Sequence, residues 1–115
     1  MSRNDRLRIL DILDAIDKVF CYAAGQTYED FLEDAKTQDA VARNIEIIGE
    51  ASRSISKSFK AAYPHIPWRQ MVDMRNTLIH VYFGIMPDIV WDVIHKELPE
   101  LKRLLIEVAE SSKNP

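Results

Sequence analysis

Apolar side chains recur every three to four residues along almost the whole chain, and this spacing limits the fold more than any other feature. The first run consists of Ile9, Ile12, Leu13, Ile16, Val19, Phe20 and Ala23. A period near 3.6 gathers such residues on one face of an α-helix, whereas a half-buried strand needs strict alternation. Only three glycines and five prolines interrupt the 115 residues. The pattern therefore predicts an all-α protein.

The interruptions between the apolar runs predict where the helices begin and end. We expect long helices at residues 5–24, 38–60, 68–82 and 88–110, and a short helical element at 28–34. Gly25 provides a C-terminal stop for the first helix, and Thr37 offers an N-cap side chain for the second. Pro67 suits the first turn of the third, and Pro99 predicts a kink in the last. Short turns between such helices favour an antiparallel bundle of four to five helices.

One domain accounts for the whole chain. Since domains commonly hold about 100–150 residues, a chain of this length has room for one modest core. No internal repeat is visible, which argues against a solenoid. We therefore expect a single helical domain over residues 1–115, with a frayed tail at about 111–115.

Charge and cysteine content limit the function classes. Fifteen Lys and Arg against eighteen Asp and Glu give a net charge of −3. Strong sequence-independent binding of nucleic acid requires many basic residues, so any RNA contact must be local or shared between subunits. Charges interrupt the apolar runs, so we expect no signal peptide and no membrane span. Cys21 cannot form an internal disulfide; we expect it buried as a small hydrophobe, in a cytoplasmic protein.

A cation, an imidazole and a phenol stand within eight residues, at Arg75, His80 and Tyr82. Metal-free cleavage of RNA needs a base for the ribose 2′-hydroxyl, an acid for the leaving 5′-oxygen and a cation for the transition state. An imidazole titrates near neutral pH and can serve as base or acid. The planar guanidinium of Arg75 matches phosphate oxygens. Asn76 could position a phosphate or a sugar hydroxyl. The cluster thus suits phosphoryl chemistry.

Helical geometry complicates a site built from these residues alone. Positions five apart, such as Arg75 and His80, lie about 140° apart around a regular helix. The long arginine side chain, a loosened helix end at residues 81–84, or a two-fold dimer could each bring the groups together. We favour the dimer, because two copies would supply two arginines and two histidines to one cleft. Tyr82, seven residues after Arg75, falls on nearly the same face as Arg75.

Taken alone, an Arg-x-x-x-x-His spacing in a helical protein is more often structural than catalytic. His65 and His95 are better interpreted as structural or solvated residues. Three scattered histidines and one cysteine lack the spacing of zinc ligands, so no metal and no cofactor are expected. The chain also lacks a glycine-rich phosphate loop and a nucleophile elbow.

Other segments share a family pattern with the cluster. These are Asp11-Ile12-Leu13-Asp14-Ala15-Ile16, the run from Ala40 to Ala51, Ile66-Pro67-Trp68 before Met74-Arg75-Asn76, and Ile89-Val90-Trp91 with Leu98-Pro99. Together with Arg-x-x-x-x-His-x-Tyr, they resemble the HEPN superfamily, specifically the HepT toxins of HepT/MntA (HEPN/MNT) toxin–antitoxin systems. The resemblance extends from about Arg6 to Leu105 and is far more specific than the short motif.

The resemblance implies the toxin of a type VII-like toxin–antitoxin pair. Its fold would be a HEPN bundle of four to five helices that dimerises, so that both Arg-x-x-x-x-His motifs line one cleft. It implies a metal-independent endoribonuclease with Arg75 and His80 as the catalytic pair. It also implies a cognate MntA-type nucleotidyltransferase antitoxin, which transfers AMP to Tyr82 and could form a higher hetero-oligomer with this chain. A phosphodiester on Tyr82 would place negative charge where an RNA phosphate should bind.

A rival hypothesis from another class remains open. A non-catalytic helical module could dimerise and escort a minimal nucleotidyltransferase, with Arg75 and His80 holding only nucleotide phosphate. The intact Arg, His and Tyr set favours the enzyme, because an escort has less use for an imidazole. A helical dimer with no chemistry ranks third.

Overall fold

The structure is a computed structural model that describes the backbone of residues 1–82 and 87–111, and the side chains of 1–76 and 87–111. All regular elements in these ranges are helical, which confirms the all-α prediction. In chain order they are α1 (Arg3–Ala23), α2 (Tyr28–Glu33), α3 (Ala35–Ser54), α4 (Lys57–Ala62), α5 (Trp68–Tyr82), α6 (Pro87–Asp92), a π-helical turn η1 (Val93–Glu97) and α7 (Leu98–Ser111).

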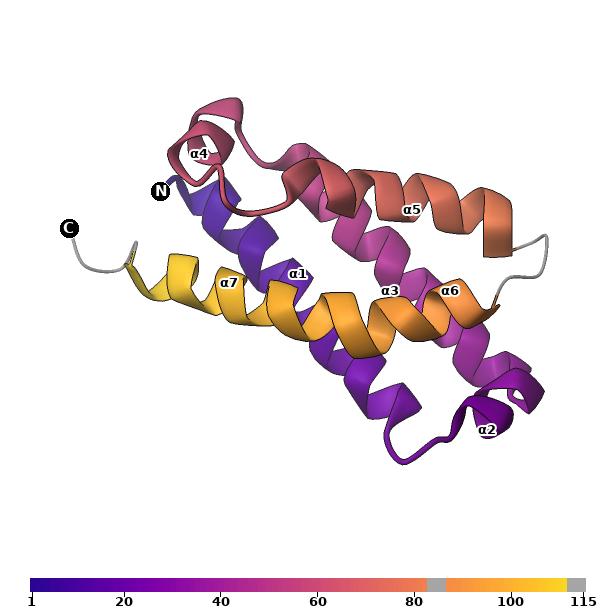
Figure 1. Ribbon diagram of the computed structural model, residues 1–115. Coiled ribbons are helices and arrows are strands. Elements are labelled where there is room, and N and C mark those ends of the chain that lie inside the picture. The colour runs from indigo at the N-terminus through magenta and orange to yellow at the C-terminus, as the bar shows by residue number, and fades with distance from the viewer. Residues whose placement is uncertain (83–86, 112–115) are drawn as a thin grey trace.

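The long helices form an antiparallel bundle (Figure 1). Helix α3 lies between α1 and α5 and packs extensively against both, while α7 packs against α1. Helix α6, η1 and α7 follow one another as one nearly continuous rod that returns along the bundle (Figure 1). The short helices α2 and α4 close opposite ends of the bundle.

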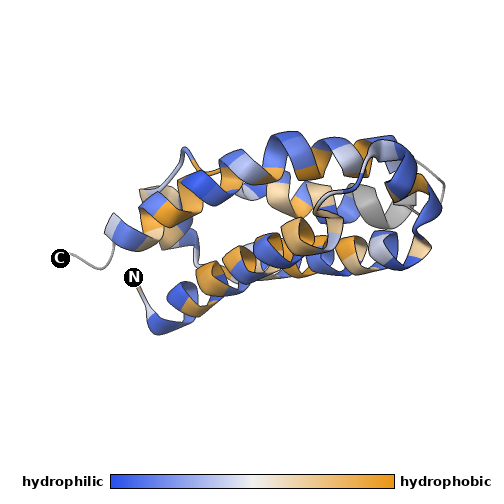
Figure 2. Ribbon diagram, turned by 90° about the horizontal axis from the view of Figure 1, so that it is seen from below, coloured by the Kyte–Doolittle hydropathy of each residue, from blue (hydrophilic) through white to orange (hydrophobic). Residues whose placement is uncertain are grey.

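The core contains the apolar faces that the sequence predicts. In Figure 2 each helix carries both hydrophobic and hydrophilic stretches, as expected for helices that bury one side. The largest fully buried side chains are Phe31, Ile9, Ile12, Ile16, Ile45, Ile48, Ile66, Met71, Leu98, Leu105, Val19 and Val41. Full burial of one such side chain is worth about 1.5–3 kcal/mol, so this core is the main source of stability.

The helix starts show where the predicted boundaries need correction. The second long helix begins at Ala35, because Asp34 rather than Thr37 is its N-cap. The carboxylate of Asp34 accepts hydrogen bonds from the backbone N–H of Thr37 at 3.0 Å and from its hydroxyl at 2.6 Å. Gly25 has a φ of +75°, as expected for the residue that terminates α1.

The helix predicted at residues 38–60 is divided into α3 and α4. Ile55 adopts an extended conformation, and the Ser56 hydroxyl accepts a hydrogen bond from the N–H of Phe59 as the N-cap of α4. This break allows the Phe59 ring to pack against Tyr63 and Trp68, at centroid distances of 4.9 and 6.0 Å. Packing of a buried aromatic cluster thus outweighs continuation of the helix.

The last predicted helix is interrupted by η1 just before Pro99. Within this turn the N–H of Leu98 donates to the carbonyl of Val93, five residues earlier. Pro99 has no N–H and cannot supply the next α-helical hydrogen bond, so a widened turn is a favourable way to accommodate it. The tail predicted at 111–115 begins at Ser111, the last residue of α7, and otherwise lies outside the described residues.

One prediction about the surface is wrong. Cys21 is exposed rather than buried. The buried stripe of α1 passes through Val19 and Ala23, and position 21 falls about 200° from Val19 around the helix. An apolar neighbourhood in the sequence therefore did not imply burial. Among the described helices, none combines the length and the hydropathy needed to cross a membrane.

A buried carboxylate joins the start of α1 to the start of α4. Asp5 is only 5% exposed and accepts hydrogen bonds from the backbone N–H of Ser56 at 2.9 Å and from the Ser56 hydroxyl at 2.6 Å. Burial raises the pKa of Asp5, but these bonds, the Ser2 hydroxyl and the positive N-terminus together lower it below its ordinary value of 3.8. The ionised carboxylate is therefore the form that stabilises the fold.

We predict that Asp5→Asn lowers the free energy of unfolding at pH 7 by about 1.5–3 kcal/mol, the usual worth of hydrogen bonds to a charged group. The folded-state pKa is depressed, so the stabilisation is complete above the unfolded-state pKa and is lost as pH falls through the folded value. Urea unfolding of both proteins from pH 7 downward should show the difference shrinking with acid. Asp11→Asn, an exposed substitution on the same helix, is the control. A pH-independent difference for Asp5→Asn would contradict the prediction.

Candidate functional site

The stem of Arg75 lies directly against the backbone of α3. A β-carbon on Gly49 would stand 2.4 Å from the Cβ of Arg75, 3.0 Å from its Cδ and 3.1 Å from its Cγ. No side chain fits at so short a distance, so glycine is required for α3 and α5 to approach as they do. This contact explains why a glycine stands inside α3, and the residue across the contact is the arginine of the motif.

The guanidinium of Arg75 is held at both terminal nitrogens. Its Nη2 lies 2.6 Å from Oε1 of Glu50 on α3, and its Nη1 donates to Oδ1 of Asn76 at 3.2 Å. The Nε is buried and has no hydrogen-bond partner among the described residues. The Arg75 side chain is 26% exposed, so its guanidinium lies at the edge of the interface between α3 and α5. A cation fixed in this way is suited to receive an anion from solvent.

Helix α5 keeps Arg75 and His80 on different sides. The helix is regular through Tyr82, so positions 75 and 80 lie about 140° apart, and no loosened end occurs at residues 81 and 82. The remainder of that predicted loosening, at 83 and 84, lies outside the described residues, as do the side chains of His80 and Tyr82. The backbone therefore does not unite the motif on one helix face.

Asn76 stands between the two parts of the motif. It is exposed, and it is four residues before His80, which makes the two positions neighbours on the helix surface. Its side chain oxygen already contacts the Arg75 guanidinium. Asn76, which was predicted to position the substrate, therefore lies between the Arg75 guanidinium and the side of α5 that carries position 80.

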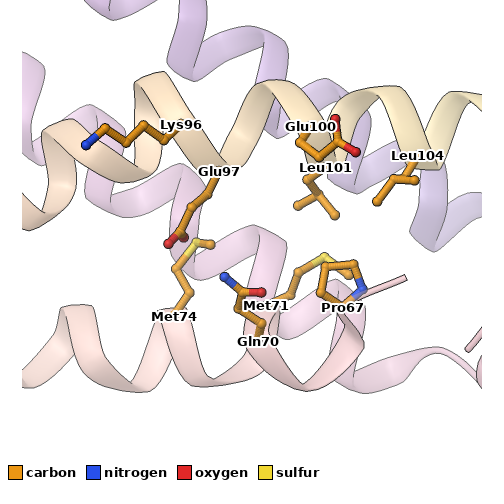
Figure 3. A pocket seen from close by; sticks show the side chains of 9 residues that line it. All are labelled: Pro67, Gln70, Met71, Met74, Lys96, Glu97, Glu100, Leu101 and Leu104. Carbon is orange, nitrogen blue, oxygen red and sulfur yellow. The ribbon is translucent and has the colours of Figure 1, made fainter. Parts of the chain in front are cut away.

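Another side of α5 borders a separate pocket of about 240 Å³. Figure 3 shows side chains of α7 and η1 extending toward those at the start of α5. The lining residues are Pro67, Gln70, Met71, Met74, Lys96, Glu97, Glu100, Leu101 and Leu104. None of the four predicted site residues is among them. The pocket is therefore distinct from the arginine, which faces α3.

The remaining histidines belong to the surface. His65 is exposed beside Tyr63, and exposed His95 packs its ring at a tilt against Trp91 with a centroid distance of 4.1 Å. Trp91 also contacts Tyr28 and Phe31 and so connects α2 to α6. Within the described part of the chain, no three His, Cys, Asp or Glu side chains form a group that could hold a metal ion.

Comparison with known families agrees with the helical pattern and the motif. A family model described as "Ribonuclease HepT-like" matches residues 12–108, which is most of the chain. The chain belongs to the HepT-like ribonuclease family. The match includes all four predicted site residues and the α3 segment that packs against Arg75.

Individual relatives extend the match over nearly full lengths. A protein named "Probable ribonuclease HepT" from Thermococcus cleftensis is 44% identical over 102 residues, 89% of this chain and 93% of its own length. A "Putative RNase" from Methanocaldococcus jannaschii is 34% identical over 119 residues, covering 99% and 98%. One from Caldanaerobacter subterraneus is 39% identical over 89 residues, covering 77% and 80%. No solved structure matches the chain significantly.

Sequence reasoning missed Glu50 as part of the site. It lies on another helix, 25 positions before Arg75, and its spacing from the motif does not distinguish it from other surface carboxylates. The adjacent Gly49 was the available signal, because a glycine inside a long helix often marks a close approach. The residue after such a glycine lies at the edge of the contact between the two helices.

We predict that Gly49→Ala destabilises the protein by about 1–3 kcal/mol, the usual cost of overpacking, although alanine is the better helix former. The added methyl would collide with Cβ of Arg75 and force α3 and α5 apart. Chemical unfolding should show a smaller loss in an Arg75→Gly background, which removes that Cβ. An equal loss in both backgrounds would show that the collision is not the cause.

Proposed function

We propose that this chain is an endoribonuclease in which Arg75 and His80 act on the scissile phosphate. The observation that carries the proposal is the fixed, partly exposed Arg75 guanidinium in a member of a ribonuclease family. The names of the relatives are consistent with this activity. An acidic protein also needs such a local cation to attract a phosphate.

The proposed reaction is transfer of the phosphate to the neighbouring 2′-oxygen. A base removes the 2′-hydroxyl proton, the 2′-oxygen forms a new bond to phosphorus, and the bond from phosphorus to the 5′-oxygen breaks as an acid protonates that oxygen. The products are a 2′,3′-cyclic phosphate and a free 5′-hydroxyl. His80 would serve as base or acid, and Arg75 would stabilise the negative charge of the transition state. Asn76 would orient the phosphate or the sugar through its exposed amide.

We propose that the working site is formed between two copies of the chain. The regular helix separates positions 75 and 80, so one subunit offers Arg75 toward α3 and position 80 on another side of α5. A two-fold axis near α5 would bring two imidazoles together, one as base and one as acid. It would also double the local positive charge.

We further propose that a nucleotidyltransferase antitoxin controls the enzyme by transferring AMP to Tyr82. Position 82 lies two turns after Arg75 and on nearly the same face of α5. The transfer would join the phenolic oxygen to the α-phosphorus of ATP and release pyrophosphate. The added phosphodiester would place a negative charge and a nucleoside beside the arginine, which would disfavour RNA binding. The protein would then be the toxin of a toxin–antitoxin pair.

We predict that the purified protein, free of any antitoxin, cleaves RNA in the presence of EDTA. Arg75→Ala and His80→Ala should each reduce the rate by about 10²-fold or more, the usual scale for loss of an acid–base group or a charge-stabilising donor. Gel analysis of RNA fragments would measure the rate, and end-group analysis should detect cyclic phosphates.

His65→Ala is the matched control for this experiment, because His65 is exposed and lies outside α5. It should leave the cleavage rate unchanged. If wild type and His80→Ala cleave equally slowly, the enzyme proposal fails. The escort hypothesis would then be favoured, provided that the chain still binds a nucleotidyltransferase.

We predict that incubation with a cognate nucleotidyltransferase and ATP adds AMP-sized mass to the protein and abolishes RNA cleavage. Intact mass spectrometry would measure the increment. Tyr82→Phe should remove it, whereas Tyr22→Phe, at a tyrosine that is 42% exposed on α1, should not. Persistence of the increment in Tyr82→Phe would exclude Tyr82 as the acceptor.

A further inference from the structure

Glu50 is the residue of another helix that directly contacts the proposed catalytic arginine. Its Oε1 lies 2.6 Å from Nη2 of Arg75, and its side chain is 54% exposed. This pair joins α3 to α5, whereas most of the other ion pairs in the described part of the chain connect residues on one helix. Glu50 therefore affects where the head of Arg75 lies relative to the rest of the bundle.

The two neighbouring residues of α3 hold different parts of the arginine. Gly49 accommodates the aliphatic stem, which lies close to the helix backbone, and Glu50 holds one end of the guanidinium. A free arginine side chain has about 2 kcal/mol of rotamer entropy to lose when it becomes ordered. Contact at the stem and at the head restricts that freedom before a substrate arrives.

The contacts leave donors available for a phosphate. A guanidinium has five N–H groups. Nη2 forms an ion pair with Glu50, Nη1 donates a hydrogen bond to Asn76, and the buried Nε–H has no partner in the described part of the chain. One N–H on each terminal nitrogen remains without a hydrogen bond to a described residue. A phosphate could approach these two donors while Glu50 stays in place.

We infer that Glu50 is the positioning residue of Arg75, an inference that rests on the proposed ribonuclease function. Its carboxylate orients the guanidinium toward the scissile phosphate and does not itself contact the substrate. Glu50 also has a cost, because a carboxylate near a bound phosphate repels it. If Glu50 positions Arg75, its removal should lower the rate of cleavage. If Glu50 only repels the phosphate, its removal should raise that rate.

Steady-state cleavage of RNA by Glu50→Ala and Glu50→Gln tests this inference. We expect Glu50→Ala to lower kcat by about tenfold or more, since a misplaced catalytic group can cost up to about 10²-fold, while KM stays equal or falls. Glu50→Gln keeps an acceptor oxygen for Nη2, so it should recover most of kcat. An unchanged or increased kcat in Glu50→Ala would overturn the inference.

Glu46→Ala is the matched control. Glu46 lies one turn before Glu50 on α3 and pairs with Arg43 at 3.5 Å, away from Arg75. It should leave both kinetic constants unchanged. Thermal unfolding should show nearly equal stability for wild type, Glu46→Ala and Glu50→Ala, because ion pairs this exposed contribute little. A large loss of stability in Glu50→Ala would assign its effect to folding and overturn the positioning role.

The double variant Glu50→Ala/Arg75→Ala separates the inference from the proposed function. If Glu50 acts through Arg75, its removal should have no further effect on kcat in an Arg75→Ala background. If Arg75→Ala cleaves like wild type, the proposed function fails, whatever Glu50 does. If Arg75→Ala is impaired and Glu50→Ala lowers kcat equally in both backgrounds, only the positioning role fails.

Discussion

The close contact between Gly49 and Arg75 determines much of what this bundle can do. It sets the separation of α3 and α5 at the middle of α5, and it places a cationic side chain where an apolar one would be the ordinary choice for a helix interface. The stem of the arginine contributes packing, and its head reaches the surface beside Glu50. One residue thus belongs both to the interior and to the proposed site.

Further packing contacts lie at both ends of the bundle. Asp5 ties the beginning of α1 to the cap of α4, and Phe59, Tyr63 and Trp68 pack under the turn that leads into α5. At the other end, Trp91 connects α2 with α6. The start of α5 and the start of the returning helix α6 are therefore both anchored by aromatic packing.

Apolar periodicity predicted the helices and their buried faces, because those depend on neighbours along the chain. Helix starts were less predictable, because several residues near each start could act as the N-cap. Asp34 caps α3 in place of Thr37, and Ser56, which caps α4, is held by a tertiary contact with Asp5. Cys21 was predicted buried from its neighbours but lies across the helix from the stripe. The motif residues were visible as a pattern, whereas the pairing of Glu50 with Arg75 joins two helices, and its only local signal was the adjacent Gly49.

Because α5 is regular, the proposed RNA cleavage and the proposed inhibition by AMP on Tyr82 require different arrangements of the helix. Positions 75 and 82 share a face, so a nucleotide on Tyr82 could act on the arginine of its own subunit. Positions 75 and 80 do not share a face, so bringing an imidazole to the phosphate held by Arg75 requires a second subunit or a long reach around the helix. In the proposed dimer, inhibition could thus operate within one chain, whereas catalysis would depend on two. Because Glu50 already offsets part of the charge of Arg75, a second arginine from the partner would strengthen the attraction of the cleft for RNA.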